Sequence, residues 1–181
     1  MSHRLFVGID LPNPVRIPLH ALQCGLRDAR WVAAENLHLT LRFIGEVDRI
    51  QADDIDHALM TVHAAPIDIE LRDAGAFGSG NRARILWAGV VRTPTLSELK
   101  TRIDAALGHA GIPPDDRKFA PHITLARFTN GPMREVNQRA AELAPTITGR
   151  FTAHEFTLFE SRLGSGGAHY DRAASYPLIA L

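Results

Sequence analysis

Two histidine–threonine pairs, 84 residues apart, are the residues of this chain best suited to chemistry. The first pair is His38 and Thr40 in the segment His-Leu-Thr-Leu, and the second is His122 and Thr124 in His-Ile-Thr-Leu. Imidazole is the side chain whose unperturbed pKa lies nearest neutral pH, so it can act as a general acid or a general base. A hydroxyl next to it can hydrogen-bond an oxygen of a phosphate group.

Hydrolysis of a phosphodiester needs two proton transfers at one phosphorus centre. A neutral imidazole can remove a proton from the attacking water, while a protonated imidazole gives a proton to the departing oxygen. The two threonine hydroxyls can hold the non-bridging oxygens, whose charge must be stabilised in the transition state. This chemistry requires no metal ion, and it predicts a bell-shaped dependence of rate on pH because the two imidazoles must be in opposite protonation states.

Each pair lies in a segment that alternates between apolar and polar residues, which predicts strands over about 37–44 and 121–128. Successive side chains of a strand point to opposite faces, so the histidine and threonine of each segment share one face and the apolar residues between them face the core. A single segment of this kind would most simply be a pair of polar strand positions. Two of them, in matching surroundings, favour a shared site.

The order strand, helix, histidine strand, helix, strand occurs twice along the chain. The distance from His38 to Ile67 is 29 residues, and the distance from His122 to Phe151 is also 29 residues. We infer an internal duplication. Two similar halves commonly pack about a pseudo-twofold axis, which would bring the two histidine strands face to face across one cleft.

The predicted architecture is a single bilobal domain over 1–181. Its pseudo-repeats cover about 4–77 and 84–161, and a final strand follows at about 168–180. The chain has no glycine-rich phosphate loop and ends in a predicted hairpin with a glycine-rich tip at 164–167. These features favour an α+β fold with two mostly antiparallel sheets, helices on the outside and a central cleft.

Composition excludes several classes of protein. The chain has 20 basic and 20 acidic residues, so it does not coat nucleic acid by net charge, and any polyanion must be bound by a local patch. The single cysteine, Cys24, excludes an internal disulfide and a cysteine metal cluster. We see no signal peptide and no apolar stretch of membrane-spanning length. We therefore expect a cytoplasmic protein that does not bind membranes. We take it to be a monomer, although the sequence does not determine the oligomeric state.

The two histidine segments and their flanks resemble the two-histidine (2H) phosphoesterase superfamily. His-Leu-Thr-Leu-Arg-Phe-Ile-Gly-Glu-Val at 38–47 and His-Ile-Thr-Leu-Ala-Arg at 122–127 are most similar to its RNA 2',3'-cyclic phosphodiesterase branch, also called 2'-5' RNA ligases. The similarity covers essentially the whole chain. It includes Phe-Val-Gly-Ile-Asp at 6–10, Leu-Trp-Ala-Gly at 86–89 and Glu-Ser-Arg-Leu at 160–163.

The resemblance implies metal-independent, cofactor-free hydrolysis of an RNA 2',3'-cyclic phosphate to a 2'-phosphomonoester. Such a ring needs a 2'-hydroxyl, so only RNA can supply it. Members of the branch can also join tRNA half-molecules through a 2'-5' bond, so tRNA fragments are possible partners. The resemblance carries over His38 and His122 as catalytic residues and Thr40 and Thr124 as substrate-binding residues. The sequence does not decide the roles of the histidines; we take His122 as the base and His38 as the acid.

Two arginines are candidates for binding the phosphate. Arg127 follows the second threonine in the form that is typical of the family, although strict alternation would place it on the face opposite His122. Arg42 has the same parity as His38 and Thr40, which predicts that it shares their face. A solvated surface arginine is the alternative for each.

Four aromatic residues near these segments could stack on a base, namely Phe43, Phe77, Trp87 and Phe128. Core packing is the preferred interpretation for all four, and least so for Phe77 because it borders a glycine loop. Two other functions remain open. The chain could be a non-catalytic RNA-end or nucleotide-binding module, or a phosphodiesterase of the same mechanism that acts on a small cyclic nucleotide.

Overall fold

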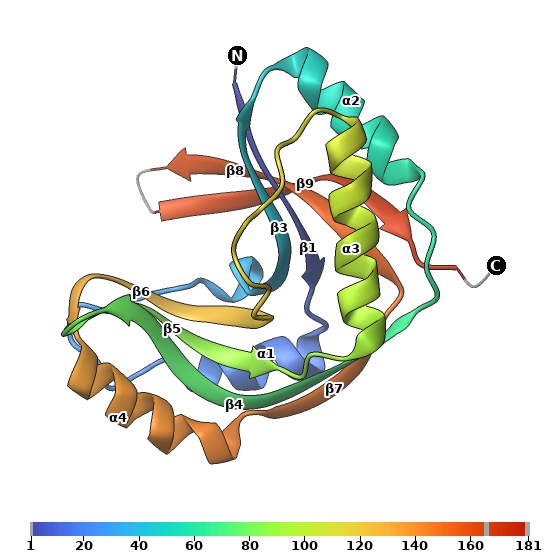
Figure 1. Cartoon of the computed structure of the whole chain (residues 1–181). Coiled ribbons are helices and arrows are strands. Elements are labelled where there is room, and N and C mark those ends of the chain that lie inside the picture. The colour runs from blue at the N-terminus through green and yellow to red at the C-terminus, as the bar shows by residue number, and fades with distance from the viewer. Residues whose placement is uncertain (1, 165–166, 180–181) are drawn as a thin grey trace.

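The computed structural model describes residues 2–164 and 167–179 (Figure 1). The helices in this part of the chain are α1 (Asn13–Ala21), α2 (Arg49–Met60), α3 (Pro94–His109) and α4 (Met133–Leu143), with short 3-10 turns η1 (Ala34–Asn36) and η2 (Ala144–Thr146). The strands are β1 (His3–Asp10), β2 (Arg30–Trp31), β3 (His38–Val47), β4 (Ile67–Ser79), β5 (Arg82–Val90), β6 (His122–Pro132), β7 (Thr148–Ala153), β8 (Glu155–Gly164) and β9 (Gly167–Pro177).

The strands follow the order β7-β4-β5-β6-β3-β1-β8-β9, with β2 paired to β6, and their pairings are antiparallel. The predicted α+β class with antiparallel strands is confirmed. The two predicted sheets are continuous with each other, because β3 and β6 pair at Leu39 and Ile123. The midpoint of the strand order lies between β3 and β6. Strands at equal distances from this midpoint occupy corresponding positions: β1 corresponds to β5, β8 to β4, and β9 to β7.

The two histidine strands share an irregularity at the same place. In β3 the register with β1 skips Leu41, and in β6 the register with β5 skips Leu125. Such a β-bulge sets two residues against one and interrupts the alternation of side chains. The fifth residue after each histidine, Phe43 in β3 and Arg127 in β6, therefore returns to the face that carries the histidine. The sequence alternation alone did not reveal this.

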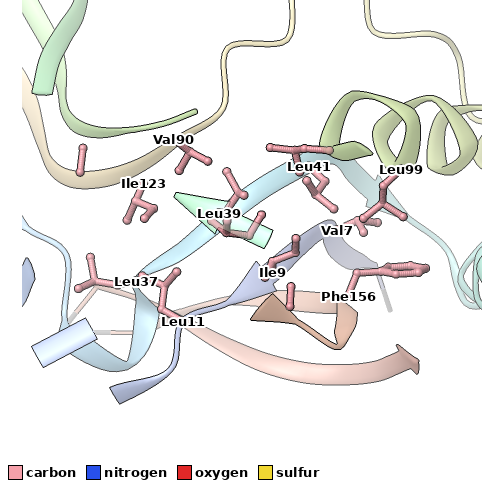
Figure 2. Close-up of a cluster of buried hydrophobic side chains, with 14 of the residues drawn as sticks. Val7, Ile9, Leu11, Leu37, Leu39, Leu41, Val90, Leu99, Ile123 and Phe156 are labelled. Carbon is pink, nitrogen blue, oxygen red and sulfur yellow. The ribbon is translucent and has the colours of Figure 1, made fainter. Parts of the chain in front are cut away.

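Leu39, Leu41 and Ile123 of the two central strands belong to the buried apolar core (Figure 2). Leu39 and Ile123 are fully buried at the junction of β3 and β6, and Leu99 of α3 packs on the same cluster. Helix α3 begins after the N-cap Thr93, whose hydroxyl accepts a hydrogen bond from the Leu96 amide, so this threonine opens the helix. Helices α2 and α4 lie at the periphery of the fold (Figure 1).

Two predicted boundaries differ from the structure. The segment predicted as one strand over about 148–161 forms two strands, β7 and β8. Strand β7 is the direct neighbour of β4, whereas β8 occupies the position in the other half of the sheet that corresponds to β4. The predicted glycine-rich tip at 164–167 includes residues 165–166, and the predicted last strand includes residue 180, all of which lie outside the described residues. Among the described helices, none combines the length and apolar character needed to cross a membrane.

Candidate active site

Both histidines stand at the first position of a central strand, His38 in β3 and His122 in β6. The pair Leu39–Ile123 points into the core, and the residues that flank it point the other way. In an antiparallel register, this pair sets Thr40 opposite His122 and His38 opposite Thr124. The structure thus brings the four predicted residues together on one surface, which we call the tetrad face.

Both imidazole rings are fixed by the same type of hydrogen bond. The Nδ1 atom of His38 lies 2.7 Å from the carbonyl oxygen of Asn36, and Nδ1 of His122 lies 2.7 Å from the carbonyl oxygen of Ala120. A carbonyl oxygen can only accept, so Nδ1–H is the donor in both cases. The Nε2 atoms are left for chemistry. Nε2 of His38 lies 2.9 Å from the Thr40 hydroxyl.

The ring of His38 is enclosed by aromatic side chains. Its centroid lies 4.7 Å from that of Phe6, 5.2 Å from that of Tyr170 and 5.8 Å from that of Phe159. Burial lowers the pKa of His38 to about 4, and the positive charge of Arg127 acts in the same direction. The hydrogen bond to the Asn36 carbonyl opposes this shift only in part. His38 is therefore neutral at pH 7 when no anion is bound.

The ring of His122 is more open. Phe77 meets it edge-on at a centroid distance of 4.9 Å, and Trp87 lies at 6.4 Å. Burial lowers the pKa of His122 as well, with a smaller contribution from the charge of Arg127, while the hydrogen bond to the Ala120 carbonyl acts in the opposite direction. Both imidazoles thus hold a proton less readily than a free histidine.

The two candidate arginines have different positions. Arg127 is exposed on the tetrad face, because the bulge at Leu125 reverses the alternation that would have turned it away. The predicted placement of Arg42 beside Thr40 is wrong. The corresponding bulge at Leu41 directs Arg42 toward α3, where it is 5% exposed and donates hydrogen bonds to Asp104 and to the carbonyl oxygen of Pro113. Its guanidinium ties the chain before β6 to β3 and α3.

The four aromatic candidates, like the two arginines, divide between the tetrad face and the interior. Phe128 is buried in the core, as predicted. Trp87 is half-buried beside His122. Phe43 and Phe77 are 41% and 36% exposed, so the preferred interpretation of core packing is wrong for both. The guanidinium of Arg4 lies 5.3 Å from the centroid of the Phe43 ring and covers one side of it. The other side of this ring lies at the edge of the tetrad face.

Sequence reasoning missed the residues that surround His38. Phe6 lies in the segment 6–10, which resembles the family, so this resemblance was a signal that could have pointed to it. Tyr170 carried no such signal, because only the register of β9 against β8 brings it to this ring. Gly8 was also missed. A Cβ atom there would lie 2.8 Å from the Leu39 carbonyl oxygen and 3.4 Å from Cδ2 of His38, so glycine lets β1 approach the backbone of β3 beside the ring.

Other features of the molecule lie apart from the tetrad face. An open cavity of about 620 Å³ lies between α2 and the strands β1, β8 and β9, and none of its lining residues belongs to the two histidine segments. Within residues 2–164 and 167–179, no three or more His, Cys, Asp or Glu side chains gather in a way that could hold a metal ion.

Comparison with known proteins finds similarity over most of the chain. Residues 11–164 match the family model described as "2'-5' RNA ligase superfamily". A protein of Methanocaldococcus jannaschii named RNA 2',3'-cyclic phosphodiesterase is 30% identical over 172 residues, which cover 93% of this chain and 96% of that protein. A protein of Escherichia coli K12 with the same name is 30% identical over 171 residues, or 92% of each chain. The crystal structure of E. coli LigT complexed with 3'-AMP superimposes with a TM-score of 0.81 at 28% identity, covering 99% of this chain and 100% of that one.

Proposed function

Because this chain belongs to the 2'-5' RNA ligase superfamily, we propose that it is an RNA 2',3'-cyclic phosphodiesterase. It opens the cyclic phosphate at an RNA end to a 2'-phosphomonoester. The observation that carries the proposal is the pair of Nε2 atoms, from His38 and His122, presented on one face by rings whose Nδ1 atoms are both tied to carbonyl oxygens.

The reaction is an exchange of one bond at phosphorus. The oxygen of a water molecule forms a bond to phosphorus, and the bond from phosphorus to the 3'-oxygen breaks. One imidazole takes the proton that the water loses, and the other gives a proton to the 3'-oxygen. Exchange with solvent then restores the starting protonation states. The two imidazoles supply both the acid and the base, so no metal ion is required.

We assign His122 as the base and His38 as the acid. Deeper burial makes the His38 imidazolium the stronger acid, while His122, which is more open, is the stronger base of the two. This arrangement needs a proton on His38 when the substrate is bound. The negative charge of the cyclic phosphate favours it, because a nearby anion stabilises the protonated imidazole.

Two threonines and one arginine complete the proposed site. Thr40 and Thr124 stand opposite His122 and His38 in the register of β3 and β6, and in the proposed reaction their hydroxyls donate hydrogen bonds to the non-bridging oxygens. In the free protein the Thr40 hydroxyl is hydrogen-bonded to His38, so binding of the phosphate exchanges one partner for another. Arg127 contributes positive charge from the same face. Arg42 has no part in the site, because its guanidinium is held by Asp104 and Pro113.

We extend the proposal to the setting of the enzyme. The chain acts as a bilobal domain of two pseudo-repeats around a cleft, as a monomer in the cytoplasm, on RNA ends that include tRNA fragments. It does not act on membranes. The free and exposed Cys24 is consistent with a reducing compartment. Joining of tRNA halves through a 2'-5' bond is the same opening of the cyclic phosphate, with the 5'-hydroxyl of the other RNA half in place of water.

An end-group assay tests this function. An RNA oligonucleotide that ends in a 2',3'-cyclic phosphate is incubated with the protein, with and without a metal chelator, and the product end is identified. We expect a 2'-phosphate in equal yield under both conditions. A 3'-phosphate product, loss of activity with chelator, or tight binding without turnover would each overturn the proposal.

A further inference from the structure

Two arginines face each other on the tetrad face, beyond the second histidine segment. Arg30 of β2 is the direct partner of Arg127 of β6. The next pair, Trp31 and Ala126, is turned toward the core, where Ala126 is fully buried. Because side chains alternate along each strand and directly opposed residues share a face, Arg30 lies on the same face as Arg127.

This pair has no apparent structural purpose. Like charges directly opposite each other on a sheet destabilise it. Both arginines are exposed, and within the described ranges 2–164 and 167–179 neither forms an ion pair or a side-chain hydrogen bond. Many other arginines of the chain do find an acidic partner, for example Arg16 with Asp10. A bound anion would remove the repulsion, and guanidinium groups suit phosphate oxygens in particular.

The distance of this pair from the proposed reaction centre is also informative. Arg127 follows Thr124 by three residues, one of which is taken up by the bulge at Leu125. The two side chains are therefore two strand positions apart, roughly 7 Å. One nucleotide of a single strand spans a separation of this order. Arg127 is thus too far along β6 to duplicate Thr124, and close enough for its charge to act on both histidines.

Building on the proposed function, we propose that Arg30 and Arg127 bind the 5'-phosphate of the terminal nucleotide while its 2',3'-cyclic phosphate lies between the two histidines. In an RNA chain this 5'-phosphate is the internucleotide phosphodiester that joins the last nucleotide to its neighbour. The pair is therefore a specificity site. It distinguishes an RNA end, which carries the second phosphate, from a nucleoside 2',3'-cyclic phosphate, which lacks it.

The test compares two small substrates that differ in one group. They are adenosine 2',3'-cyclic phosphate with a 5'-hydroxyl and the same compound with a 5'-phosphate. The preference is the ratio of their kcat/KM values. We expect the wild type to favour the 5'-phosphorylated compound and Arg30→Gln to reduce that ratio about tenfold, the effect of losing one charge-assisted hydrogen bond. Arg30→Lys should retain part of the preference, because it keeps the positive charge but loses the paired N–H donors of the guanidinium group.

Arg134→Gln is the matched control. Arg134 is exposed on α4, a helix that packs on the core side of the sheet, so the substitution removes the same charge from a different surface. It should leave the ratio unchanged. An Arg30→Gln variant with the wild-type ratio, or an equal loss on both substrates, overturns the inference and leaves the proposed function intact. Absence of turnover of both compounds and of the RNA oligonucleotide by the wild type overturns both.

Discussion

The two halves of the tetrad face share their backbone geometry but differ in the side chains that surround each histidine ring, which we call the walls of that half. Each half presents a histidine at the start of a strand, a ring held by the carbonyl two residues earlier, and a bulge after the threonine. The first half then encloses its ring with Phe6, Phe159 and Tyr170, whereas the second half leaves its ring at the side of Phe77 and Trp87.

This difference explains how a scaffold with two similar halves can perform an unsymmetrical reaction. Proton transfer at one phosphorus needs an acid and a base, yet two identical imidazoles would have identical pKa values. Tyr170 reaches only the first ring, because β9 lies beside β8 on that side of the sheet. The positions opposite the threonines differ too: Gly8 faces Thr40, and Trp87 faces Thr124. The common backbone sets the positions of the rings, and the walls set their pKa values.

Removing either ring should have the largest effect. His38→Ala and His122→Ala should each lower kcat on an RNA cyclic phosphate by about 10²- to 10⁴-fold, because in the proposed reaction each ring carries one proton transfer. The double variant should be little worse than either single one, since the two act as a unit. Circular dichroism and the Tm establish that the variants are folded. Independent, multiplicative losses would contradict a shared reaction centre.

Substitution of the threonines should have the next largest effect on kcat, and it should distinguish the two halves by its effect on the histidine titrations. Thr40→Val and Thr124→Val should each reduce kcat about 10²-fold, the usual cost of one donor to a developing oxyanion. Only Thr40→Val should also change the titration of His38, because only the Thr40 hydroxyl is hydrogen-bonded to its ring in the free protein. Proton NMR of the two imidazoles in each variant provides the comparison. Equal changes in both variants would show that the halves do not differ here.

Arg127 and its counterpart Phe43 occupy the same position after the bulge in their two strands. Arg127→Gln should lower kcat/KM about tenfold through the loss of a charged contact to phosphate. It should also move the pH profile. Both histidine pKa values lie below 6.5, so the bell-shaped kcat/KM profile of the wild type should have its maximum below pH 6.5. Removal of the positive charge raises both pKa values and shifts the maximum to higher pH.

The control for this shift is Phe43→Leu, which alters the other half without changing charge. Its pH optimum should coincide with that of the wild type. An optimum for Arg127→Gln that stays in place or moves to lower pH would mean that the guanidinium does not act on the two rings.

The smallest expected effect comes from opening the wall of the first half. Tyr170→Ala admits water to His38 and weakens the desolvation that lowers its pKa, so the ring should gain its proton at a higher pH than in the wild type. Phe77→Ala is the matched change in the second half and should raise the pKa of His122 without raising that of His38, because a charge on His122 lowers the pKa of His38. Imidazole NMR titrations measure both pKa values. A rise in the pKa of the opposite ring in either variant would contradict the assignment of these aromatic residues to separate halves.

The sequence was sufficient for the parts of this site that follow from local alternation. His38, Thr40, His122 and Thr124 share a face because two apolar residues in each segment have to be buried. The matching surroundings of the two segments were visible for the same reason. The bulges were not, because a bulge depends on which residue of the neighbouring strand is skipped. This is why Arg42 was placed on the wrong face and why the position of Arg127 seemed to conflict with its parity.

The remaining features depend on contacts between distant parts of the chain. The junction of β3 and β6 at Leu39 and Ile123 makes one sheet of the predicted two, and no local pattern encodes it. Tyr170 reaches His38 only through the register of the last hairpin. Arg30 belongs to a strand of two residues, which is too short to give a periodic signal. Burial of Phe43 was predicted from its type, although its side of the strand is left open.

The most direct test of the division of labour replaces the leaving oxygen. In an RNA 2',3'-cyclic phosphate with sulfur in place of the 3'-oxygen, the leaving thiolate needs no proton, so a variant without the acid should recover activity. We predict that this substrate rescues His38→Ala and does not rescue His122→Ala. Rescue of His122→Ala alone would reverse the two roles, and rescue of both variants or of neither would contradict a reaction in which one imidazole is the acid and the other the base.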